Sequence, residues 1–127
     1  MRHSGFTMIE MIFVIVILGI LAAVAIPKFS ATRTDAQISS ARATISAVRS
    51  GIETERQRRL LRGESNYVAS LGEHFENVLT YPDKRWSKSG ERYSITIEGT
   101  TCSFDYNATS GRFLLVSTSG LCASLDI

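Results

Sequence analysis

A long apolar stretch near the start of the chain ends at a proline. Residues Met11 to Ile26 carry no charge and almost nothing polar, and Phe6 to Ile9 extend this apolar character on the amino side. A helix that crosses a bilayer needs roughly 20 apolar residues at about 1.5 Å rise per residue. The pattern therefore predicts a membrane-spanning helix near the amino terminus.

Three residues break the uniformity of this stretch. Glu10 places one carboxylate in it, and a charged side chain at the centre of a bilayer costs on the order of 2.5–3.5 kcal/mol, so such an acid usually has a partner or a role. The alternative is that Glu10 lies at the headgroup level near the end of the span. Pro27 lacks an N–H and clashes with the carbonyl of Ala23, and Gly19 is a second weak point, so a continuous helix is expected to bend or lose hydrogen bonds here.

A narrow apolar stripe continues the helical pattern after the proline. Its members recur at alternating spacings of three and four residues: Ala31, Thr34, Ile38, Ala41, Ile45, Val48 and Ile52. This spacing places them on one face of a helix. Together with the apolar stretch, the stripe predicts one helix from about Phe6 to Leu61, ended by Gly63. Its outer half is expected to bury the stripe against the rest of the chain.

The last third of the chain has the period-two alternation of β-strands. Three strands are predicted, with turns at Gly99-Thr100 and at Asn107 to Gly111: Tyr93 to Glu98, Thr101 to Tyr106 and Arg112 to Ser117. Phe113, Leu115 and Leu114 are the candidates to face inward from the third strand. The predicted fold class is α+β, with a long amino-terminal helix packed against a small antiparallel sheet of three to four strands.

Residues 64–92 connect the helix to the sheet, and their pattern is irregular. Val68 to Leu79 fit a short helix, Pro82 marks a turn, and the aromatic side chains of the segment are expected to fill a small satellite core. Trp86 has basic residues on both sides, so the alternative for it is an exposed patch of basic and aromatic side chains.

A known family pattern is visible at the amino-terminal end. A short basic leader precedes Gly5-Phe6-Thr7-Met8-Ile9-Glu10, and an apolar helix with a proline at its end follows, which resembles a type IV pilin or a type II secretion pseudopilin. The resemblance implies that a prepilin peptidase cuts after Gly5 and that the new amino terminus at Phe6 is N-methylated. It also implies that Glu10 neutralises the terminal amine of an adjacent subunit during assembly, and that helix is often lost between residues 19 and 27 in filaments. Such pairing offsets the desolvation cost of both charges.

The resemblance also implies an organisation, a location and partners. The expected parts are a cleaved leader (1–5), a membrane and filament-core helix (6–27), the amphipathic half of the same helix (28–63), the connecting loop (64–92), and the sheet with its disulfide-closed carboxy-terminal region (93–127). The protein is expected in the inner membrane with a cytoplasmic amino terminus, and then in an extracellular pilus or a periplasmic pseudopilus. The implied partners are copies of itself, prepilin peptidase, the assembly platform with its ATPase, minor pilins and membrane lipid.

A conventional secretory signal is the rival interpretation of this end. The sequence Ala23-Val24-Ala25 fits an A-x-A cleavage site, and its use would release a soluble protein that begins at Ile26. The acid Glu10 inside the apolar segment and the start Gly5-Phe6-Thr7 argue against it, because a cleaved signal has no reason to keep them.

Charge and cysteine content narrow the possibilities further. The chain has 127 residues and a formal net charge of +2, from which no polyanionic partner follows,. Cys102 and Cys122 lie outside any C-x-x-C spacing,. Behind an export segment they favour a disulfide, whose loop of about twenty residues would stabilise the fold by roughly 3 kcal/mol; the alternative is two unpaired buried thiols.

No arrangement of residues typical of an enzyme stands out. His3 lies in the leader and His74 is the other histidine, so a histidine-based metal or acid-base site has no second member in the mature chain,. The serines lack a G-x-S-x-G context, and no phosphate-binding loop is present. Near the carboxy terminus only Asp105 and Asp126 offer carboxylates for calcium, which argues against such a site. No cofactor or metal is expected.

Two weaker signals remain. Asp105-Tyr106-Asn107-Ala108-Thr109 contains an N-x-T acceptor for glycosylation at Asn107 and resembles the longer bacterial acceptor sequence with an upstream acid; the alternative is a hairpin turn that favours Asp and Asn. Four arginines near the helix end could bind nucleic acid phosphates: Arg56, Arg58, Arg59 and Arg62,. The alternative is a solvated helix end with favourable dipole interactions, and it is preferred.

The function predicted from the sequence is therefore a non-enzymatic structural subunit of a type IV pilus-like filament. A type II secretion pseudopilin is the alternative, and the expected disulfide and the weak calcium signal favour the pilin. Two further classes remain open: an exported binding protein anchored singly by its helix, and a soluble exported enzyme, which only the A-x-A sequence supports.

Overall fold

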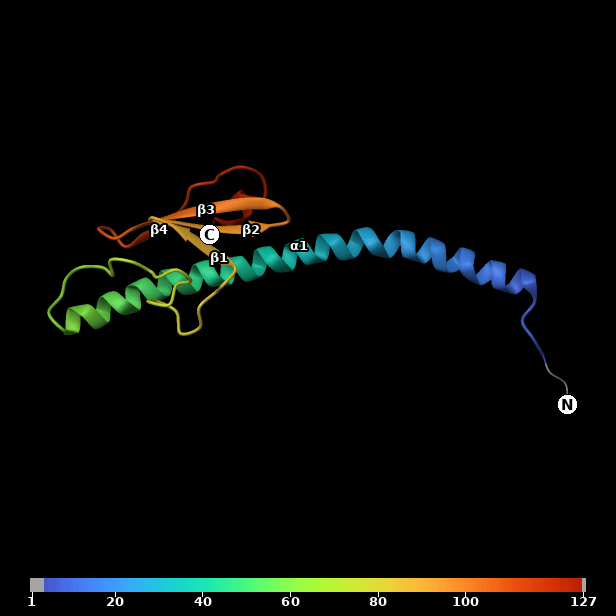
Figure 1. The fold of residues 1–127 in the computed structure, drawn as a ribbon, viewed down its shortest axis with the longest axis horizontal. Helices are drawn as coiled ribbons and strands as arrows, with labels where there is room; N and C mark the ends of the chain where they lie inside the picture. The colour runs from blue at the N-terminus through green and yellow to red at the C-terminus, as the bar shows by residue number, and fades with distance from the viewer. Residues whose placement is uncertain (1–3, 127) are drawn as a thin grey trace. The chain divides into compact units, whose positions relative to one another are not determined.

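A computed structural model describes residues 4–126 of the chain. It contains one long helix, α1 (Met8–Leu61), and four strands, β1 (Trp86–Ser89), β2 (Arg92–Ile97), β3 (Thr100–Asn107) and β4 (Arg112–Leu115), followed by a short 3-10 helix, η1 (Gly120–Leu125) (Figure 1). The chain divides into two compact units between Asp35 and Ala36. Helix α1 contributes to both, and each unit is described separately. The α+β fold class is confirmed.

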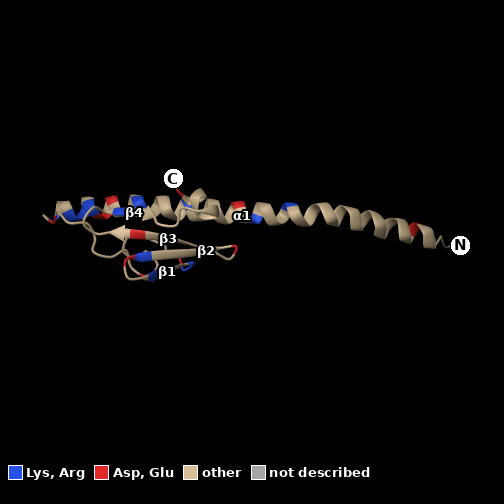
Figure 2. Cartoon of the chain, turned by 90° about the horizontal axis from the view of Figure 1, so that it is seen from above, with Lys and Arg blue, Asp and Glu red and all other residues tan. Residues whose placement is uncertain are grey.

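The first unit consists of the apolar half of α1 and the residues before it. No Lys, Arg, Asp or Glu occurs between Met11 and Pro27, and this part of the helix is tan throughout in Figure 2. Its most apolar window has a mean hydropathy of 3.0, and none of that window is buried. By length and composition this segment can cross a membrane. Of the predicted leader, residues 1–3, which include His3, lie outside the described residues.

Helix α1 begins slightly later than expected and is continuous. Its first residue is Met8 rather than Phe6, because Thr7 caps the helix instead of joining it. The helical assignment passes through Gly19 and Pro27 without a break. The distortion expected at these two residues stays a prediction for the assembled state.

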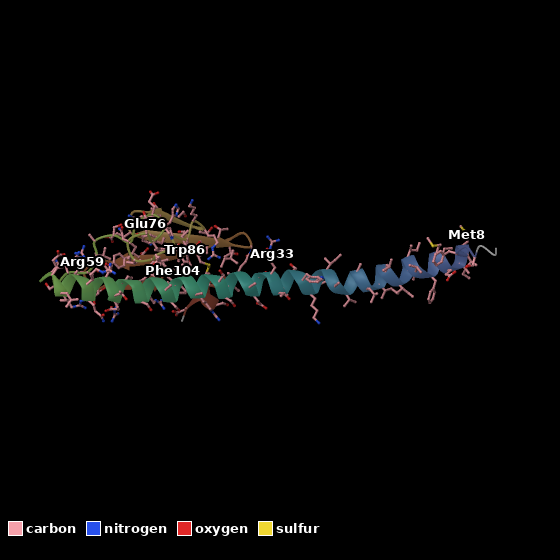
Figure 3. All side chains as sticks on the ribbon, turned by 90° about the horizontal axis from the view of Figure 1, so that it is seen from below. Met8, Arg33, Arg59, Glu76, Trp86 and Phe104 are labelled. Carbon is pink, nitrogen blue, oxygen red and sulfur yellow. A yellow bond between two sulfur atoms is a disulfide. The ribbon has the colours of Figure 1, made fainter. Side chains whose placement is uncertain are left out.

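The second unit buries the predicted stripe of α1 under the sheet. Ala41, Ile45, Val48 and Ile52 are fully or almost fully buried, and Ile38 is partly buried against the same core. Figure 3 shows Trp86 and Phe104 on the side of α1 where the sheet lies. The stripe is therefore buried, as the sequence predicts, against the sheet region of the same chain. Ala31, which belongs to the first unit, is exposed.

The sheet is antiparallel, with the strand order β1-β2-β3-β4. Alternate residues of the central strands point inward, as the period-two pattern predicts,. The β2–β3 hairpin closes through Glu98 and Gly99, whose φ angles of 48° and 75° are the positive values that a tight two-residue turn requires,. The inward aromatic side chains form one cluster with the connecting segment: Phe75, Trp86, Tyr93, Phe104 and Phe113.

Three details of the prediction are wrong. Strand β1 lies inside the segment expected to be a loop. Its first residue, Trp86, is only 1% exposed, so its side chain belongs to the core as expected, and the alternative of a surface patch is excluded. Val68 to Leu79 contain no helix; a single turn ties Leu79 to Phe75. Leu114 is 52% exposed because it alternates with the inward Phe113. A four-residue strand is too short for period two to distinguish it from a loop.

The carboxy-terminal end of α1 has the geometry predicted from Gly63. The Gly63 N–H donates to the carbonyl of Leu60 at 3.0 Å, and the Glu64 N–H donates to the carbonyl of Arg59 at 2.9 Å. These are the two bonds of a Schellman motif, and the φ of 85° at Gly63 is the left-handed conformation that the motif needs,. The connecting segment therefore leaves the helix in a fixed direction.

The predicted disulfide is present. Cys102 in β3 and Cys122 in η1 are bonded, with a Cα–Cα distance of 5.4 Å. Leu125 of η1 is fully buried, and Arg42 of α1 hydrogen bonds to the carbonyl of Ser124. The end of the chain is thus attached to both the sheet and the helix.

Candidate processing and assembly segment

The start of α1 is organised by Thr7 and Glu10. The Thr7 hydroxyl oxygen accepts a hydrogen bond from the Glu10 backbone N–H at 3.2 Å, and the Glu10 carboxylate accepts one from the Thr7 backbone N–H at 3.4 Å. This reciprocal pair is a capping box, which the sequence pattern T-x-x-E encodes. It satisfies two N–H groups that have no partner within the helix.

The capping box gives Glu10 a partner within a single chain. The carboxylate also lies in the first turn, where the positive end of the helix dipole favours a negative charge,. In the sequence, Glu10 stands as a single acid in an apolar segment, and its bond to Thr7 was not predicted. The T-x-x-E spacing was the available signal.

The bond between Gly5 and Phe6 lies in accessible backbone. Gly5, Phe6 and Thr7 are exposed and precede the first helical residue. A Cβ added at Gly5 would meet nothing within 4 Å. A peptidase therefore has access to this bond without unwinding α1. The backbone N–H of Thr7 remains after a cut at this position, so the capping box can persist in the processed chain.

The apolar side chains that follow are uncovered in the single chain. From Phe6 to Phe29, large apolar residues are 40–80% exposed. Soluble monomers rarely expose a contiguous apolar surface of this extent, which marks a membrane or protein contact. This segment therefore combines an accessible bond, a capped carboxylate and an apolar surface that needs a partner.

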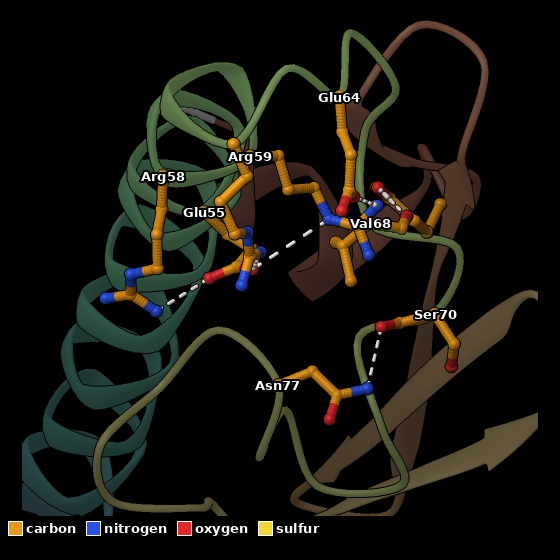
Figure 4. Close-up of polar contacts among 9 residues, drawn as sticks. Glu55, Arg58, Arg59, Glu64, Val68, Ser70 and Asn77 are labelled. Atoms are coloured by element: carbon orange, nitrogen blue, oxygen red, sulfur yellow. Dashed lines mark hydrogen bonds and ion pairs between the residues drawn. The ribbon is translucent and has the colours of Figure 1, made fainter.

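The arginines near the other end of α1 are engaged within the chain. Glu55 lies 2.7 Å from Arg58, 3.8 Å from Arg59 and 3.5 Å from Arg62, and Glu64 lies 3.1 Å from Arg59 (Figure 4). Arg56 contacts the hydroxyl of Tyr67 and lies over its ring at 4.2 Å. These contacts favour the solvated helix end over a phosphate-binding surface.

The remaining polar candidates lie apart from one another. Asp105 pairs with Arg92 at 2.8 Å, which lowers the pKa of that carboxyl group. The His74 ring donates from Nδ1 to the carbonyl of Trp86 at 2.9 Å. Within residues 4–126, no three His, Cys, Asp or Glu side chains come together in a way that could hold a metal ion.

The connecting segment is fixed to α1 by Asp83. Its carboxylate accepts hydrogen bonds from the Arg85 guanidinium at 2.8 and 2.6 Å and from the Thr44 hydroxyl at 2.9 Å. The hydrogen bonds from Arg85 are the main reason that the pKa of Asp83 falls to about 2. No sequence pattern indicates the contact between Thr44 and Asp83, because these residues are 39 positions apart in the chain.

Comparison with known proteins supports the importance of the amino-terminal segment. Residues 1–26 match the family model described as the prokaryotic N-terminal methylation motif. The chain carries this motif. The expected resemblance to type IV pilins and type II secretion pseudopilins is thereby confirmed, and individual relatives extend it.

Three relatives show how far the similarity reaches. The chain is 50% identical to the type IV narrow pilus major component of Thermus thermophilus over 50 residues, which are 39% of this chain and 43% of that protein. It is 43% identical to a fimbrial protein of Moraxella nonliquefaciens over 55 residues, 43% of this chain and 36% of that protein. It is 28% identical to the type II secretion system core protein G of Pseudomonas aeruginosa over 123 residues, 91% of this chain and 82% of that protein.

The extent of these matches differs between the two classes. The chain spans less than half the length of the two pilus proteins that it matches, whereas its match to core protein G spans most of both chains. No solved structure matches the chain significantly.

Proposed function

We propose that this chain is the structural subunit of a type IV pilus-like filament, processed between Gly5 and Phe6 and polymerised through the amino-terminal half of α1. The proposal is supported by two features that occur in the same segment. The segment that matches the methylation motif is also the segment whose apolar side chains are uncovered in the single chain.

The apolar half of α1 changes its contact partners during assembly. Lipid covers the apolar half of α1 before assembly, and the same half of other copies covers it afterwards. Addition of subunits by one repeated, non-closing contact produces a fibre. Glu10 would exchange its bond with Thr7 for the amine of Phe6 on a neighbouring copy, so the carboxylate has a hydrogen-bond donor at each stage,.

A pseudopilus subunit of a type II secretion system is the second candidate. Its support is the match to core protein G, which covers 91% of this chain, although the identity is 28%. The amino-terminal half of α1 would have the same role in both assemblies. The expected role is mechanical in either case and needs no catalytic residue.

The proposal includes a location and a set of partners. The apolar half of α1 would hold the unprocessed chain in the inner membrane with the leader on the cytoplasmic side. Prepilin peptidase would remove residues 1–5 and methylate Phe6. An assembly platform with its ATPase, together with minor pilins, would then extract and add the subunit.

Sequencing the amino terminus of the mature protein tests the processing step. The proposal predicts N-methylated Phe6 as the first residue. A mature protein that begins at Ile26 would instead identify a conventional secretory signal and contradict the proposal.

A shearing experiment tests the assembly step. The Glu10→Ala chain is expected to be folded and membrane-bound but absent from sheared surface filaments, whereas Glu91→Ala, at an exposed position in the sheet region, is expected to assemble normally. Abundant filaments of the Glu10→Ala chain would remove the proposed role of this carboxylate.

Deletion of the gene separates the two candidate assemblies. A pilus subunit predicts loss of surface appendages with secretion intact. A pseudopilus subunit predicts that secreted proteins accumulate in the periplasm while surface appendages remain.

A further inference from the structure

The turn between β3 and β4 carries a sequence feature that filament assembly does not use. Asn107-Ala108-Thr109 is the one Asn-x-Thr or Asn-x-Ser sequence in the chain. Such a sequence is the acceptor for N-linked glycosylation when it lies on the surface of an exported protein. Asn107 and Thr109 are both exposed.

The geometry of the turn directs the amide nitrogen of Asn107 outward. The side-chain oxygen Oδ1 accepts hydrogen bonds from the backbone N–H groups of Thr109 at 2.9 Å and Ser110 at 3.2 Å. Because Oδ1 faces the backbone of the turn, Nδ2, on the other branch of the planar amide, is directed away from it. Nδ2 is the atom to which an N-linked sugar is attached.

A backbone hydrogen bond and a close contact, both at Gly111, hold this turn in place. The Gly111 N–H donates to the carbonyl of Asn107 at 2.8 Å. Gly111 has a φ of 70°, and the ring of Tyr67 lies so close that a Cβ at this position would overlap it. The turn thus presents Asn107 at a fixed place on the second unit.

An acidic side chain lies upstream of the acceptor. Asp105 is two residues before Asn107, on the outward face of β3, where it pairs with Arg92 at 2.8 Å. Both side chains of this pair are about half exposed, and such surface ion pairs contribute little stability,. A glycan transferase that binds the carboxylate of Asp105 could therefore separate it from Arg92 at little cost.

The surface beside the turn has room for a sugar. A groove of about 400 Å³ lies next to the turn, and its lining includes Ala108 and Thr109 together with Arg56, Asn66 and Tyr67. These side chains offer hydrogen-bond donors, hydrogen-bond acceptors and one aromatic ring. Asn107 does not line this groove itself, but its neighbours Ala108 and Thr109 do, so a glycan on Asn107 would begin beside it.

We propose that Asn107 is the acceptor of an N-linked glycan. In the reaction, Nδ2 of Asn107 forms a bond to C1 of the first sugar of a polyprenyl-diphosphate-linked glycan. The bond between C1 and the diphosphate oxygen breaks, the polyprenyl diphosphate leaves with the electron pair, and the amide proton passes to a base of the transferase. The modification requires that the second unit is exported, and in this respect alone it rests on the proposed function.

Peptide mass spectrometry of the protein purified from its native cells tests the assignment. Trypsin cuts after Arg92 and after Arg112, and no Lys or Arg lies between these two residues. After reduction of the disulfide, it therefore releases Tyr93 to Arg112 as one peptide. The expected result is a mass excess on this peptide. An amidase that removes N-linked glycans is expected to abolish the excess and to convert Asn107 to Asp.

Variants of Thr109 separate glycosylation from a structural role of the turn. Thr109→Ala keeps Asn107 and both backbone N–H groups of the turn but removes the acceptor sequence, so the mass excess is expected to disappear. Thr109→Ser restores an acceptor sequence and is expected to restore the excess. Ser110→Ala is the control within the same turn and is expected to leave the excess unchanged.

Three results would overturn the assignment. The first is an unmodified Tyr93 to Arg112 peptide in a protein whose amino terminus is Phe6, which would leave the proposed processing intact. The second is a mass excess that persists in Asn107→Gln, which would place the group on another side chain of the peptide. The third is an excess that survives in Thr109→Ala.

Discussion

Arg49 of α1 donates two hydrogen bonds, from Nε and Nη2, to the carbonyl oxygen of Phe113 in β4, at 3.2 and 3.1 Å. Strand β4 is the last strand of the sheet, so no further strand can bind this carbonyl, and Phe113 is only 2% exposed. The helix thus supplies a hydrogen-bond donor that the sheet lacks. A buried polar group left without a partner costs about 1–3 kcal/mol.

Replacing Arg49 by methionine is expected to destabilise the second unit by about 1–3 kcal/mol, because the Phe113 carbonyl then loses its donor. Urea unfolding of the full chain in detergent measures this, followed by the fluorescence of Trp86, the single tryptophan. Arg112→Met, at an exposed position on β4, is the control and is expected to change stability little. Equal midpoints for Arg49→Met and the parent chain would contradict the prediction.

Gly51→Ala is expected to weaken the contact between α1 and the connecting segment. A Cβ at Gly51 would overlap the carbonyl oxygen of Val78 and lie 3.0 Å from its Cβ, although alanine is otherwise the better helix former,. Overpacking of this kind costs typically 1–3 kcal/mol. The measurement is the same unfolding experiment, with Ser50→Ala as the control at the exposed neighbouring position. A Gly51→Ala chain as stable as the parent would show that the segment at Val78 can move away.

Thr7→Val is expected to loosen the first turn of α1. The variant keeps the size of the side chain but loses the hydroxyl that accepts from the Glu10 N–H, and loss of a capping group costs about 0.5–2 kcal/mol,. Hydrogen exchange of the processed protein in detergent should show faster exchange of the Glu10 amide. Thr7→Ser keeps the hydroxyl and should exchange like the parent. Unchanged exchange in Thr7→Val would mean that the capping box is not formed in detergent.

The contribution of Asp83 to stability is expected to depend on pH. Its pKa is about 2 in the folded chain, below the value of 3.8 for an ordinary aspartate, so the ionised form stabilises the fold above about pH 4,. That stabilisation is lost as the pH falls through about 2. Since Arg85 is half exposed, solvent screening reduces the contribution to about 1–2 kcal/mol,.

A comparison with Asp83→Asn measures this contribution. The parent chain should be more stable than the variant at pH 7, and the difference should shrink between pH 4 and pH 2. Asp126→Asn, at the exposed end of the chain, is the control. A difference that is independent of pH would show that the charge of Asp83 is not responsible.

Long periodic patterns predicted most of the fold. The spacing of Ala41, Ile45, Val48 and Ile52 identified the buried face of α1, and alternation identified β2 and β3, because many residues of one face repeat the same signal,. Gly63 marked the end of the helix through its need for a positive φ,. Strand β1 was missed, because its burial depends on pairing with β2 and its four residues carry too little pattern.

The sequence predicted which residues form the candidate site but not the contacts between them. Gly5, Phe6 and Glu10 were recognisable because the motif is contiguous in the chain. The bond between Thr7 and Glu10 is also local and could have been found from T-x-x-E. Other contacts could not be predicted, because they join residues that are far apart in the sequence and meet only in the folded chain. Examples are the contacts of Asp83 with Thr44 and of Arg49 with Phe113.

The two outermost strands of the sheet share a property. The carbonyl of Phe113 on β4 is bound by Arg49, and that of Trp86 on β1 is bound by His74. Exposed strand edges are the usual template for unwanted sheet extension and amyloid growth. At each edge, one carbonyl that a strand of another copy would need is already bound by a side chain of the same chain, which works against sheet extension between crowded copies,.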